Sequence, residues 1–248
     1  MKLKTIILLL TVLQFALFSC NTYRSLDAAL ANPDDVIVLK IKNQNLHKLP
    51  PEIATLKNLK TLYLFRDKLV SIPKEIGELE NLEILVLSSN RLETLPPEIR
   101  NLKKLKKLSL KHNRIKNLPI EIGEIDSLEI LDIQYNKIEE LPPEIGNLKK
   151  LSFIYMNNNK LQSIPKEIGN LGNLQYLIIG KNSLTELPNE IGKLEYLIEL
   201  NLVDCGRMVV VPPSVSNLRY LEYLFIDSSI LFPYSFRSMN PRLQIIIK

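Results

Sequence analysis

The 248-residue chain has no tryptophan, only eight glycines and only two histidines. Scarce glycine argues against the glycine-rich loops that cradle nucleotide phosphates, and the sequence contains neither a phosphate loop nor a nucleophile elbow. Apolar residues make up 46% of the chain, and leucine and isoleucine dominate them. We therefore expect a core of stacked aliphatic side chains and no nucleotide-binding domain.

The chain also has little excess charge of either sign. It carries 32 lysines and arginines against 27 acidic residues, a formal net charge of +5. Two of these positive charges, Lys2 and Lys4, lie in a segment that we expect to be removed, which leaves about +3. A net charge of this size does not indicate a partner.

The first 19 residues have the pattern of a secretory signal peptide. Lys2 and Lys4 precede a mainly apolar stretch over 5–18, which is shorter than the roughly 20 residues needed to cross a bilayer. The following Leu17-Phe18-Ser19-Cys20 resembles a bacterial lipobox, although Phe18 is bulkier than the small residue usual there. This resemblance implies cleavage before Cys20 and a lipid on that cysteine. The alternative is an ordinary secretory signal in which Cys20 is incidental.

The strongest feature of the sequence is a period of 23 residues. Units begin at Val36, Leu59, Leu82, Leu105, Leu128, Leu151, Leu174 and Leu197, and a truncated unit begins at Leu221 after 24 residues. One unit reads Leu82, Leu85, Leu87, Asn90, Leu92, Leu95, Pro96, Ile99 and Leu102. The alternation at the start of each unit predicts a short strand, and successive strands stack in parallel about 4.8 Å apart. The proline at the end predicts a first helical residue on the opposite, convex side.

The ninth position of each unit is polar in most units and predicts a turn residue. A side chain here can bond the backbone of the turn that leaves the strand. The ninth residues are Gln44, Asp67, Asn90, Asn113, Asn136, Asn159, Asn182, Cys205 and Ser229. We therefore interpret Cys205 as a turn residue and not as a reactive thiol. With Cys20 assigned to lipid, no intramolecular disulfide is available.

The pattern divides the chain into four segments: a signal peptide over 1–19, a lipid anchor, linker and N-terminal cap over 20–35, eight full repeats and one truncated repeat over 36–231, and a C-terminal cap over 232–248. The N-terminal cap contains a short helix opened by Ser25, whose Leu26, Ala29 and Leu30 can cover the first core edge. The C-terminal cap ends in a strand from Leu243 to Ile247, and one extra residue near Gly206 distorts the eighth turn.

The repeated motif LPxEIGxLxxLxxLxLxxNxL, seen in Leu95–Ile99, Leu141–Leu161 and Leu187–Ile191, resembles the 23-residue repeats of Ras-associated scaffolds and of bacterial repeat lipoproteins. With the lipobox, Tyr23-Arg24-Ser25-Leu26 and Asn32-Pro33, the chain is most similar to the leptospiral leucine-rich-repeat lipoproteins. This resemblance implies an α/β leucine-rich-repeat horseshoe with a parallel concave β-sheet and short helical or 3-10 convex segments. It also implies export to the cell envelope, binding of host or bacterial proteins, and no enzymatic activity.

The outward strand positions predict a binding surface on the concave face. Neighbouring repeats place these side chains side by side, and many of them are aromatic or aliphatic. The set contains Tyr63, Phe65, Ile84, Val86, Ile130, Tyr135, Phe153, Tyr155, Tyr176, Ile178, Tyr223 and Phe225. An exposed apolar patch of this kind usually marks an interaction site. The alternative is that these residues only suit strand surfaces and pack on their cross-strand neighbours.

The fourth repeat is strongly basic and predicts a second candidate surface. Its candidate residues are Lys103, Lys104, Lys106, Lys107, Lys111 and Arg114. A further row of cations occupies the tenth position of five successive units: Lys68, Arg91, Arg114, Lys137 and Lys160. These cations could recruit an acidic protein, a sulfated glycan or anionic lipid. The alternative is a solvated face that keeps the solenoid soluble.

No residue pattern supports catalysis, a metal or a cofactor. His47 and His112 fall in units one and four, about 14 Å apart by strand stacking, too far to share a metal ion. We expect an exported, lipid-anchored binder of a protein partner, monomeric, at the outer membrane or cell surface of a bacterium, and no nucleic-acid ligand. The partner could be a host cell-surface or extracellular-matrix protein. A structural or self-associating envelope role through the closing strand is the alternative.

The lipid assignment predicts a labelling result. Cells grown with a radiolabelled fatty acid should label the wild-type chain but not Cys20→Ala, because only the cysteine thiol is the expected lipid acceptor. Gel autoradiography of the purified chain measures the label. Equal labelling of the two chains would contradict the lipoprotein assignment.

Overall fold

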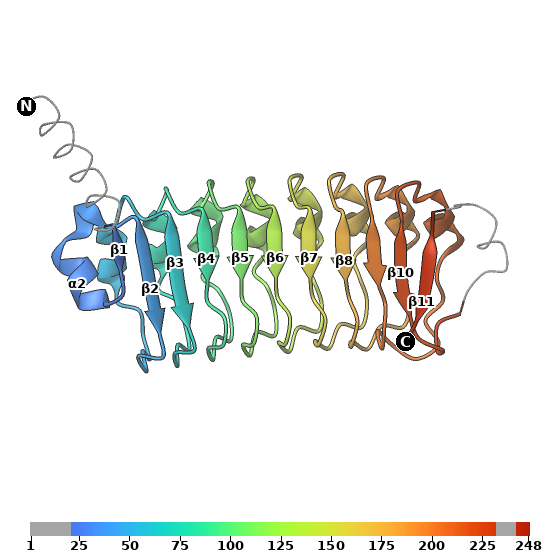
Figure 1. Cartoon of the computed structure of the whole chain (residues 1–248), viewed down its shortest axis with the longest axis horizontal. Helices are drawn as coiled ribbons and strands as arrows, with labels where there is room; N and C mark the ends of the chain where they lie inside the picture. The colour runs from blue at the N-terminus through green and yellow to red at the C-terminus, as the bar shows by residue number, and fades with distance from the viewer. Residues whose placement is uncertain (1–20, 232–241) are drawn as a thin grey trace, which may run out of the picture.

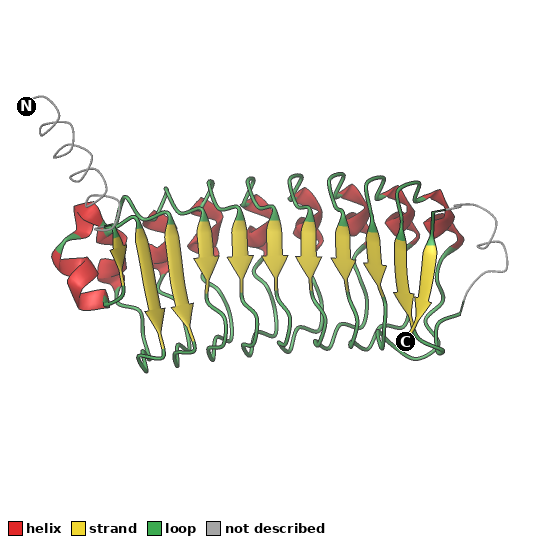
Figure 2. Cartoon of the chain, viewed as in Figure 1, coloured by secondary structure: helices red, strands yellow, loops and turns green. Residues whose placement is uncertain are grey.

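The computed structural model describes residues 21–231 and 242–248. The predicted signal peptide, Cys20 and residues 232–241 of the predicted C-terminal cap lie outside this part. Within it, one parallel sheet of 11 strands runs the length of the molecule in chain order, from β1 to β11 (Figure 1). The short helical turns of the repeats lie on the other side of the sheet from the viewer, and the N-terminal helix lies at the end of the sheet beside β1 (Figure 2). This is the predicted repeat solenoid.

Strand pairing follows the predicted period. Paired residues are 23 positions apart from β2 to β9, as in Val38↔Thr61, and 24 apart between β9 and β10, as in Glu199↔Tyr223. The extra residue lies at the turn that contains Gly206, where a Cβ would come within 1.9 Å of the Leu184 carbonyl oxygen. The strands are β1 Thr22–Tyr23, β2 Val38–Lys42, β3 Thr61–Phe65, β4 Ile84–Val86, β5 Lys107–Ser109, β6 Ile130–Asp132, β7 Phe153–Tyr155, β8 Tyr176–Ile178, β9 Glu199–Asn201, β10 Tyr223–Ile226 and β11 Gln244–Ile247.

The convex side is built from 3-10 turns packed on the same core. In each unit an isoleucine or valine of the turn is buried, as are the inward leucines of the strand, such as Leu82, Leu85 and Leu87 at 0% exposed. No helix of the described residues is long and apolar enough to cross a membrane. The turns are η1 Pro33–Asp35, η2 Pro51–Thr55, η3 Lys74–Glu78, η4 Pro97–Asn101, η5 Ile120–Glu124, η6 Pro143–Asn147, η7 Lys166–Asn170, η8 Asn189–Lys193 and η9 Pro213–Asn217.

The proline that recurs in each unit stands one residue earlier than predicted. Pro73, Pro96 and Pro142 adopt extended φ and ψ and cap the turn, so they are not its first helical residues. In units with two prolines, the second one, such as Pro97, begins the turn. Proline has no backbone N–H. The cap tolerates this as well as the first helical position does, because an N–H at either place has no acceptor within the helix.

The ninth-position asparagines hold neighbouring turns together, as predicted. Asn113 Nδ2 donates to the carbonyls of Leu87 and Leu110 at 2.9 and 2.8 Å, and its Oδ1 accepts the N–H of Leu92 at 3.0 Å. Asn90, Asn136, Asn159 and Asn182 repeat this pattern. Each amide therefore links three backbone groups from successive units, which would otherwise be buried without partners.

The turn after each strand has a conformation that the sequence did not indicate. Its eighth residue has positive φ, between 54° and 61°, in every full unit, and none of these residues is glycine: they are Asn43, Arg66, Ser89, His112, Tyr135, Asn158, Lys181 and Asp204. A non-glycine residue in this region costs roughly 1–2 kcal/mol. The asparagine bonds hold the turn in place against this cost, so position eight remains available for large side chains at the rim of the sheet.

Both described ends of the solenoid carry caps. Ser25 caps the helix α2, Leu26–Ala31, by accepting the N–H of Ala28, and Ala29 is fully buried against the core. This confirms the predicted helix. The pairing of β1 with β2 was not predicted. At the other end, β11 is the predicted closing strand and pairs with β10.

Asp67 is the one acidic member of the ninth-position row. Its Oδ1 accepts the N–H groups of Gln44 and Leu46 at 2.8 and 3.3 Å, whereas its Oδ2 is buried and has no hydrogen-bond partner in the described part of the chain. The asparagines place Nδ2 at the equivalent point and donate to two carbonyls. Asp67 is only 6% exposed, so the unmatched oxygen costs free energy.

We predict that Asp67→Asn stabilises the protein by about 1 kcal/mol, because the new Nδ2 can donate to backbone carbonyls as Asn90 does. Thermal unfolding followed by circular dichroism should show a Tm about 2–4 °C higher. Glu93→Gln, which removes an exposed negative charge, controls for net charge and should leave Tm nearly unchanged. A lower or equal Tm for Asp67→Asn would show that the carboxylate oxygen is already satisfied.

Candidate functional site

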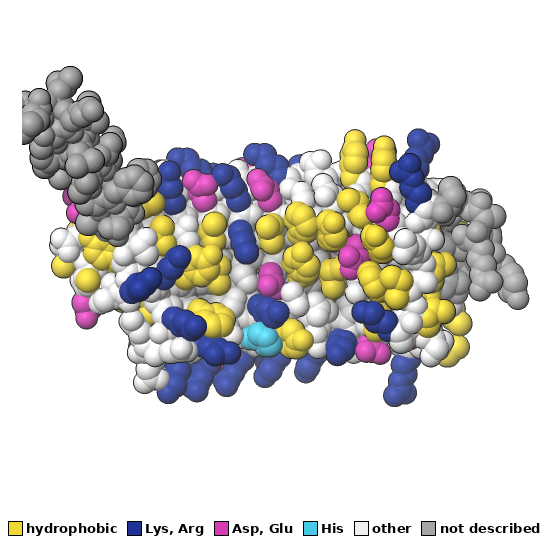
Figure 3. All heavy atoms as spheres, viewed as in Figure 1, with side chains coloured by type: hydrophobic (Ala, Val, Ile, Leu, Met, Phe, Trp, Pro, Cys, Tyr) yellow, Lys and Arg dark blue, Asp and Glu magenta, His cyan; other side chains and the backbone are white. Residues whose placement is uncertain are grey.

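The concave face carries the predicted aromatic and aliphatic side chains in three clusters. Tyr63 and Phe65 project from β3, a central group projects from β6 to β8, and Tyr223 and Phe225 project from β10. Most of these side chains are partly exposed, but Val86 is only 8% exposed and adds little surface. Figure 3 shows the apolar side chains gathered along this face.

The central cluster is the most closely packed of the three. Phe153 stacks on Tyr176 with ring centroids 4.8 Å apart and lies 6.5 Å from Tyr155. Ile130 precedes Phe153 in the same row, and Ile178 follows Tyr155 in the next. Burial raises the pKa of Tyr155, with further contributions from nearby acids. The rings therefore form a partly desolvated platform of the kind that anchors protein partners.

Tyr135 belongs to the rim and not to this platform. It lies at the eighth position of its unit, is 41% exposed and stacks on His112 with centroids 4.2 Å apart. Lys111 Nζ lies 5.4 Å from the same ring. Burial, together with the charge of Lys111, lowers the pKa of His112. His112 and Tyr135 thus form a stacked aromatic pair at the rim of the sheet.

Lysine side chains cover the first aromatic cluster, and the sequence analysis did not predict these contacts. Lys40 Nζ lies 5.5 Å from the Tyr63 ring centroid, and Lys42 Nζ lies 5.8 Å from that of Phe65. The signal was available, because Lys40 and Lys42 occupy outward positions directly before Tyr63 and Phe65 in register. These contacts are cation–π pairs, so this cluster is more polar than the central one.

Two polar interruptions separate the clusters. The predicted one lies at β5, where Lys107 and Ser109 face outward and Ser109 Oγ lies within hydrogen-bond distance of Ser88 and Asp132, at 2.9 and 3.3 Å. The second lies at β9 and was not predicted: Glu199 and Asn201 occupy the outward positions between β8 and β10. The hydrophobic patch is therefore divided twice.

The six basic residues of repeat four do not gather into one patch. Lys107 and Lys111 lie on the concave side, whereas Arg114 lies at the edge where the strands end. The other three lie toward the opposite edge and already have partners: Lys106 with Glu83 at 2.8 Å, Lys103 with the Glu124 carbonyl at 2.6 Å, and Lys104 with Asn81 at 2.7 Å. The run Lys103–Lys107 is divided between one edge and the concave side, because the chain of each unit makes a full turn around the solenoid.

The tenth-position cations do form a row. Each backbone N–H in this row donates to a carbonyl of the preceding unit at 2.8–2.9 Å, so successive residues are fixed one repeat apart. None of the five makes an ion pair among the described residues. Figure 3 shows dark blue side chains along the lower edge of the molecule, where the strands end. The members are Lys68, Arg91, Arg114, Lys137 and Lys160, and we call them the edge row.

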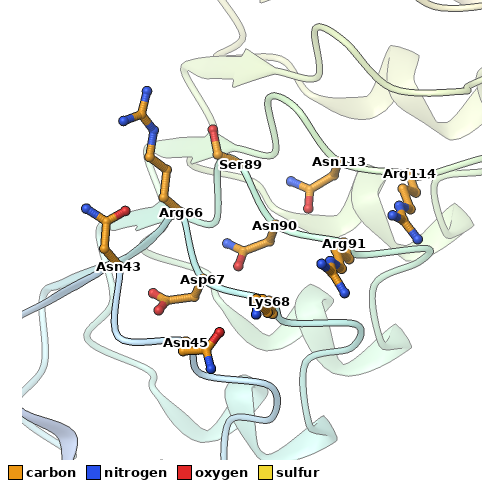
Figure 4. Close-up of a pocket in the computed structure, with 10 residues that line it drawn as sticks. All are labelled: Asn43, Asn45, Arg66, Asp67, Lys68, Ser89, Asn90, Arg91, Asn113 and Arg114. Carbon is orange, nitrogen blue, oxygen red and sulfur yellow. The ribbon is translucent and has the colours of Figure 1, made fainter.

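A shallow pocket of about 440 Å³ lies at the N-terminal end of the edge row. Lys68, Arg91 and Arg114 line it from successive turns, and Asn43 and Asn45 line it from the first unit (Figure 4). The remaining lining residues are Arg66, Asp67, Ser89, Asn90 and Asn113. Four cations and one acid thus surround it, a composition that favours an anionic group.

The described residues contain neither a cluster of side chains that could hold a metal ion nor an exposed thiol. No three histidines, cysteines or acids among them come close enough to hold a metal ion. Cys205 is fully buried, and burial raises the pKa of its thiol to about 12. Its carbonyl, and not its side chain, accepts the N–H of Leu184 at 2.7 Å, so it takes the place of the asparagine amide through its backbone.

Comparison with known proteins identifies the repeats. A profile of the leucine-rich repeat region matches residues 97–177 and 162–244, and a second leucine-rich repeat profile matches 57–115. A leucine-rich repeat protein of Leptospira interrogans is 30% identical, with a TM-score of 0.65 over 92% of this chain and 76% of that one. No curated protein matches the chain.

Two plant receptors share the fold. The ectodomain of the Arabidopsis thaliana receptor kinase GASSHO1/SCHENGEN3, in complex with CASPARIAN STRIP INTEGRITY FACTOR 2, has a TM-score of 0.74 at 24% identity, over 91% of this chain and 31% of that one. The plant peptide hormone receptor RGFR1, in complex with RGF2, has a TM-score of 0.68 at 22% identity, over 83% and 39%. The chain therefore spans less than half the length of either receptor.

Proposed function

The chain belongs to the leucine-rich repeat family, and we propose that it binds an extended segment of a protein partner across its concave face. Leucine-rich repeats are a typical scaffold for protein interaction, and the two plant receptors are in complex with CASPARIAN STRIP INTEGRITY FACTOR 2 and RGF2. The observation that carries the proposal is the central cluster, in which the Phe153 ring stacks with those of Tyr155 and Tyr176 at the surface.

The energetic reason is the exposure of large rings where polar residues would be expected. Covering apolar surface contributes roughly 25 cal/mol per Å², and aromatic side chains lose little conformational entropy when a partner covers them. A sheet face also presents side chains at fixed spacing, so a partner meets a surface that is already ordered. These features support binding over a purely structural use of the rings.

We further propose that the protein acts outside the cytoplasm, anchored by lipid on Cys20 at the bacterial outer membrane or cell surface. The lipobox-like segment Leu17–Cys20 supports this location, and the similarity to the Leptospira interrogans protein supports a bacterial source. A host cell-surface or extracellular-matrix protein then becomes a candidate partner. The structural alternative is self-association through β11, the last described strand, whose Ile247 is 69% exposed.

The central cluster generates a binding prediction. A library of random linear dodecapeptides, selected on the immobilised wild-type protein, should yield binders whose affinity falls at least tenfold for Tyr155→Ala/Tyr176→Ala. Both side chains are only partly exposed but lie outside the buried leucine core, so the variant should remain folded with at most a modestly lower Tm. Fluorescence anisotropy of the selected peptides measures affinity, and circular dichroism measures Tm.

The matched control is Tyr196→Ala/Tyr220→Ala. These tyrosines also stack, at 5.8 Å, and are 51% and 54% exposed, but they lie outside the concave rows. This variant should keep its affinity for the peptides. Loss of binding in the control, with binding kept in the concave variant, would move the site to that edge.

The edge row supports a second candidate function, binding of a sulfated glycan. Its five cations lie in a straight series along the strand ends, roughly 5 Å apart, and adjacent like charges without acidic partners repel one another. A linear polyanion can contact several of them at once and relieve this repulsion. The pocket at one end adds the amides of Asn43 and Asn45 as hydrogen-bond donors for sulfate groups.

The two basic sets predict different results on heparin. Arg91→Glu/Arg114→Glu should elute from a heparin column at a clearly lower NaCl concentration than wild type, because two cations of the edge row are reversed. Lys107→Glu/Lys111→Glu, with the same change of net charge on the concave side, should shift much less. If the second pair shifts more, repeat four and not the edge row binds the glycan.

A further inference from the structure

Glu199 places a carboxylate between two tyrosines on the concave face. Strand register pairs it with Tyr176 of β8 on one side and with Tyr223 of β10 on the other. Side chains in one row of a parallel sheet stand about 4.8 Å apart. The carboxylate therefore lies in a gap between the central cluster and the pair Tyr223 and Phe225.

This partly buried carboxylate differs from those of Asp132 and Asp227, which also lie on outward positions of the concave face. Asp132 lies within hydrogen-bond distance of Ser109 and accepts the N–H of Gln134, both at 3.3 Å, and Asp227 accepts the N–H groups of Ser229 and Asp204, both at 2.7 Å. Within the described residues, the Glu199 side chain has neither an ion pair nor a hydrogen bond. A half-buried carboxylate without a partner costs free energy, and a cation from a bound molecule would reduce this cost.

The surroundings of Glu199 favour a cation. Burial raises the pKa of its carboxyl, and the positive charge of Lys248 opposes this shift. Lys248 follows β11, is held by its N–H to the Ile226 carbonyl at 2.9 Å, and places Nζ 4.9 Å from the Phe225 ring centroid. An ammonium group on an aromatic ring is thus already present beside this gap, although it does not reach the carboxylate.

Building on the proposed protein-binding role, we propose that Glu199 and the flanking rings of Tyr176 and Tyr223 take an ammonium or guanidinium group of the partner. The partner segment would carry lysine or arginine opposite β9, with apolar side chains on the clusters at β8 and β10. A carboxylate attracts such a cation directly, and the tyrosine faces attract it through their quadrupoles. A neutral or acidic side chain at this point would leave the carboxylate covered and unpaired.

The test uses two small probes that differ only in charge. Nα-acetyl-arginine amide and its neutral analogue Nα-acetyl-citrulline amide are titrated into the full chain, and the ring resonances of Tyr176 and Tyr223 are followed by NMR. The arginine probe should shift both rings and bind at least fivefold more tightly than the citrulline probe. This preference should fade as the pH falls through the raised pKa of Glu199, because the protonated carboxyl no longer attracts a cation.

Three variants locate the effect. Glu199→Gln should bind both probes equally, whereas Glu222→Gln, an exposed acid one unit away, should keep the preference for arginine. Lys248→Met should strengthen arginine binding, because it removes the nearby positive charge. Circular dichroism confirms that each variant is folded.

Three results would overturn the inference. If both probes shift the tyrosine rings with equal affinity, the concave face binds ligands without recognising charge, and the proposed protein-binding role stands while this inference fails. A preference for arginine that survives Glu199→Gln, or no shift of either ring, would also overturn it. Failure of the proposed protein-binding role would appear separately: the selected peptides would then bind Tyr155→Ala/Tyr176→Ala as tightly as they bind the wild type.

Discussion

The side-chain amides at the ninth position are the interaction on which the structure depends. Each asparagine bonds carbonyls of its own and the preceding unit and accepts an N–H from the preceding one, as Asn136 does toward Ile133, Leu110 and Ile115. These bonds satisfy backbone groups that the solenoid buries. They also fix the distance and rotation between units, so the leucines form one continuous buried core and the turn keeps its positive φ at position eight.

Fixed stacking turns each repeat position into a row of side chains about 4.8 Å apart. Rings in one row contact rings in the next, as Phe153 and Tyr176 do, and cations in one row repel each other. Each side chain in a row therefore interacts with the equivalent side chains of the repeats before and after it. This explains why the central cluster forms a continuous surface, whereas a single different residue such as Glu199 interrupts it.

The fold could be predicted almost completely, because its information is local and repeated. The period predicted the strand register and the ninth-position row, and Ser25 followed by Leu26, Ala29 and Leu30 predicted the N-terminal helix. The concave rows followed from alternation. The basic residues of repeat four misled, because a run such as Lys103–Lys107 passes from one edge to the sheet within five residues. The ion pair of Lys106 with Glu83 joins two successive units, so the sequence of repeat four alone did not predict it.

The sequence by itself determined the solenoid, its core and the rows of side chains, because a 23-residue period leaves one way to bury the leucines. The tertiary structure decided which charges have partners. Among the described residues, Asp67 keeps an unmatched oxygen because its neighbours offer carbonyls where asparagine would donate. Within the same residues Glu199 has no partner, whereas Asp132 has two. Lys248 comes near Glu199 only because β11 pairs with β10. Such differences depend on distances between units, which no periodic pattern contains.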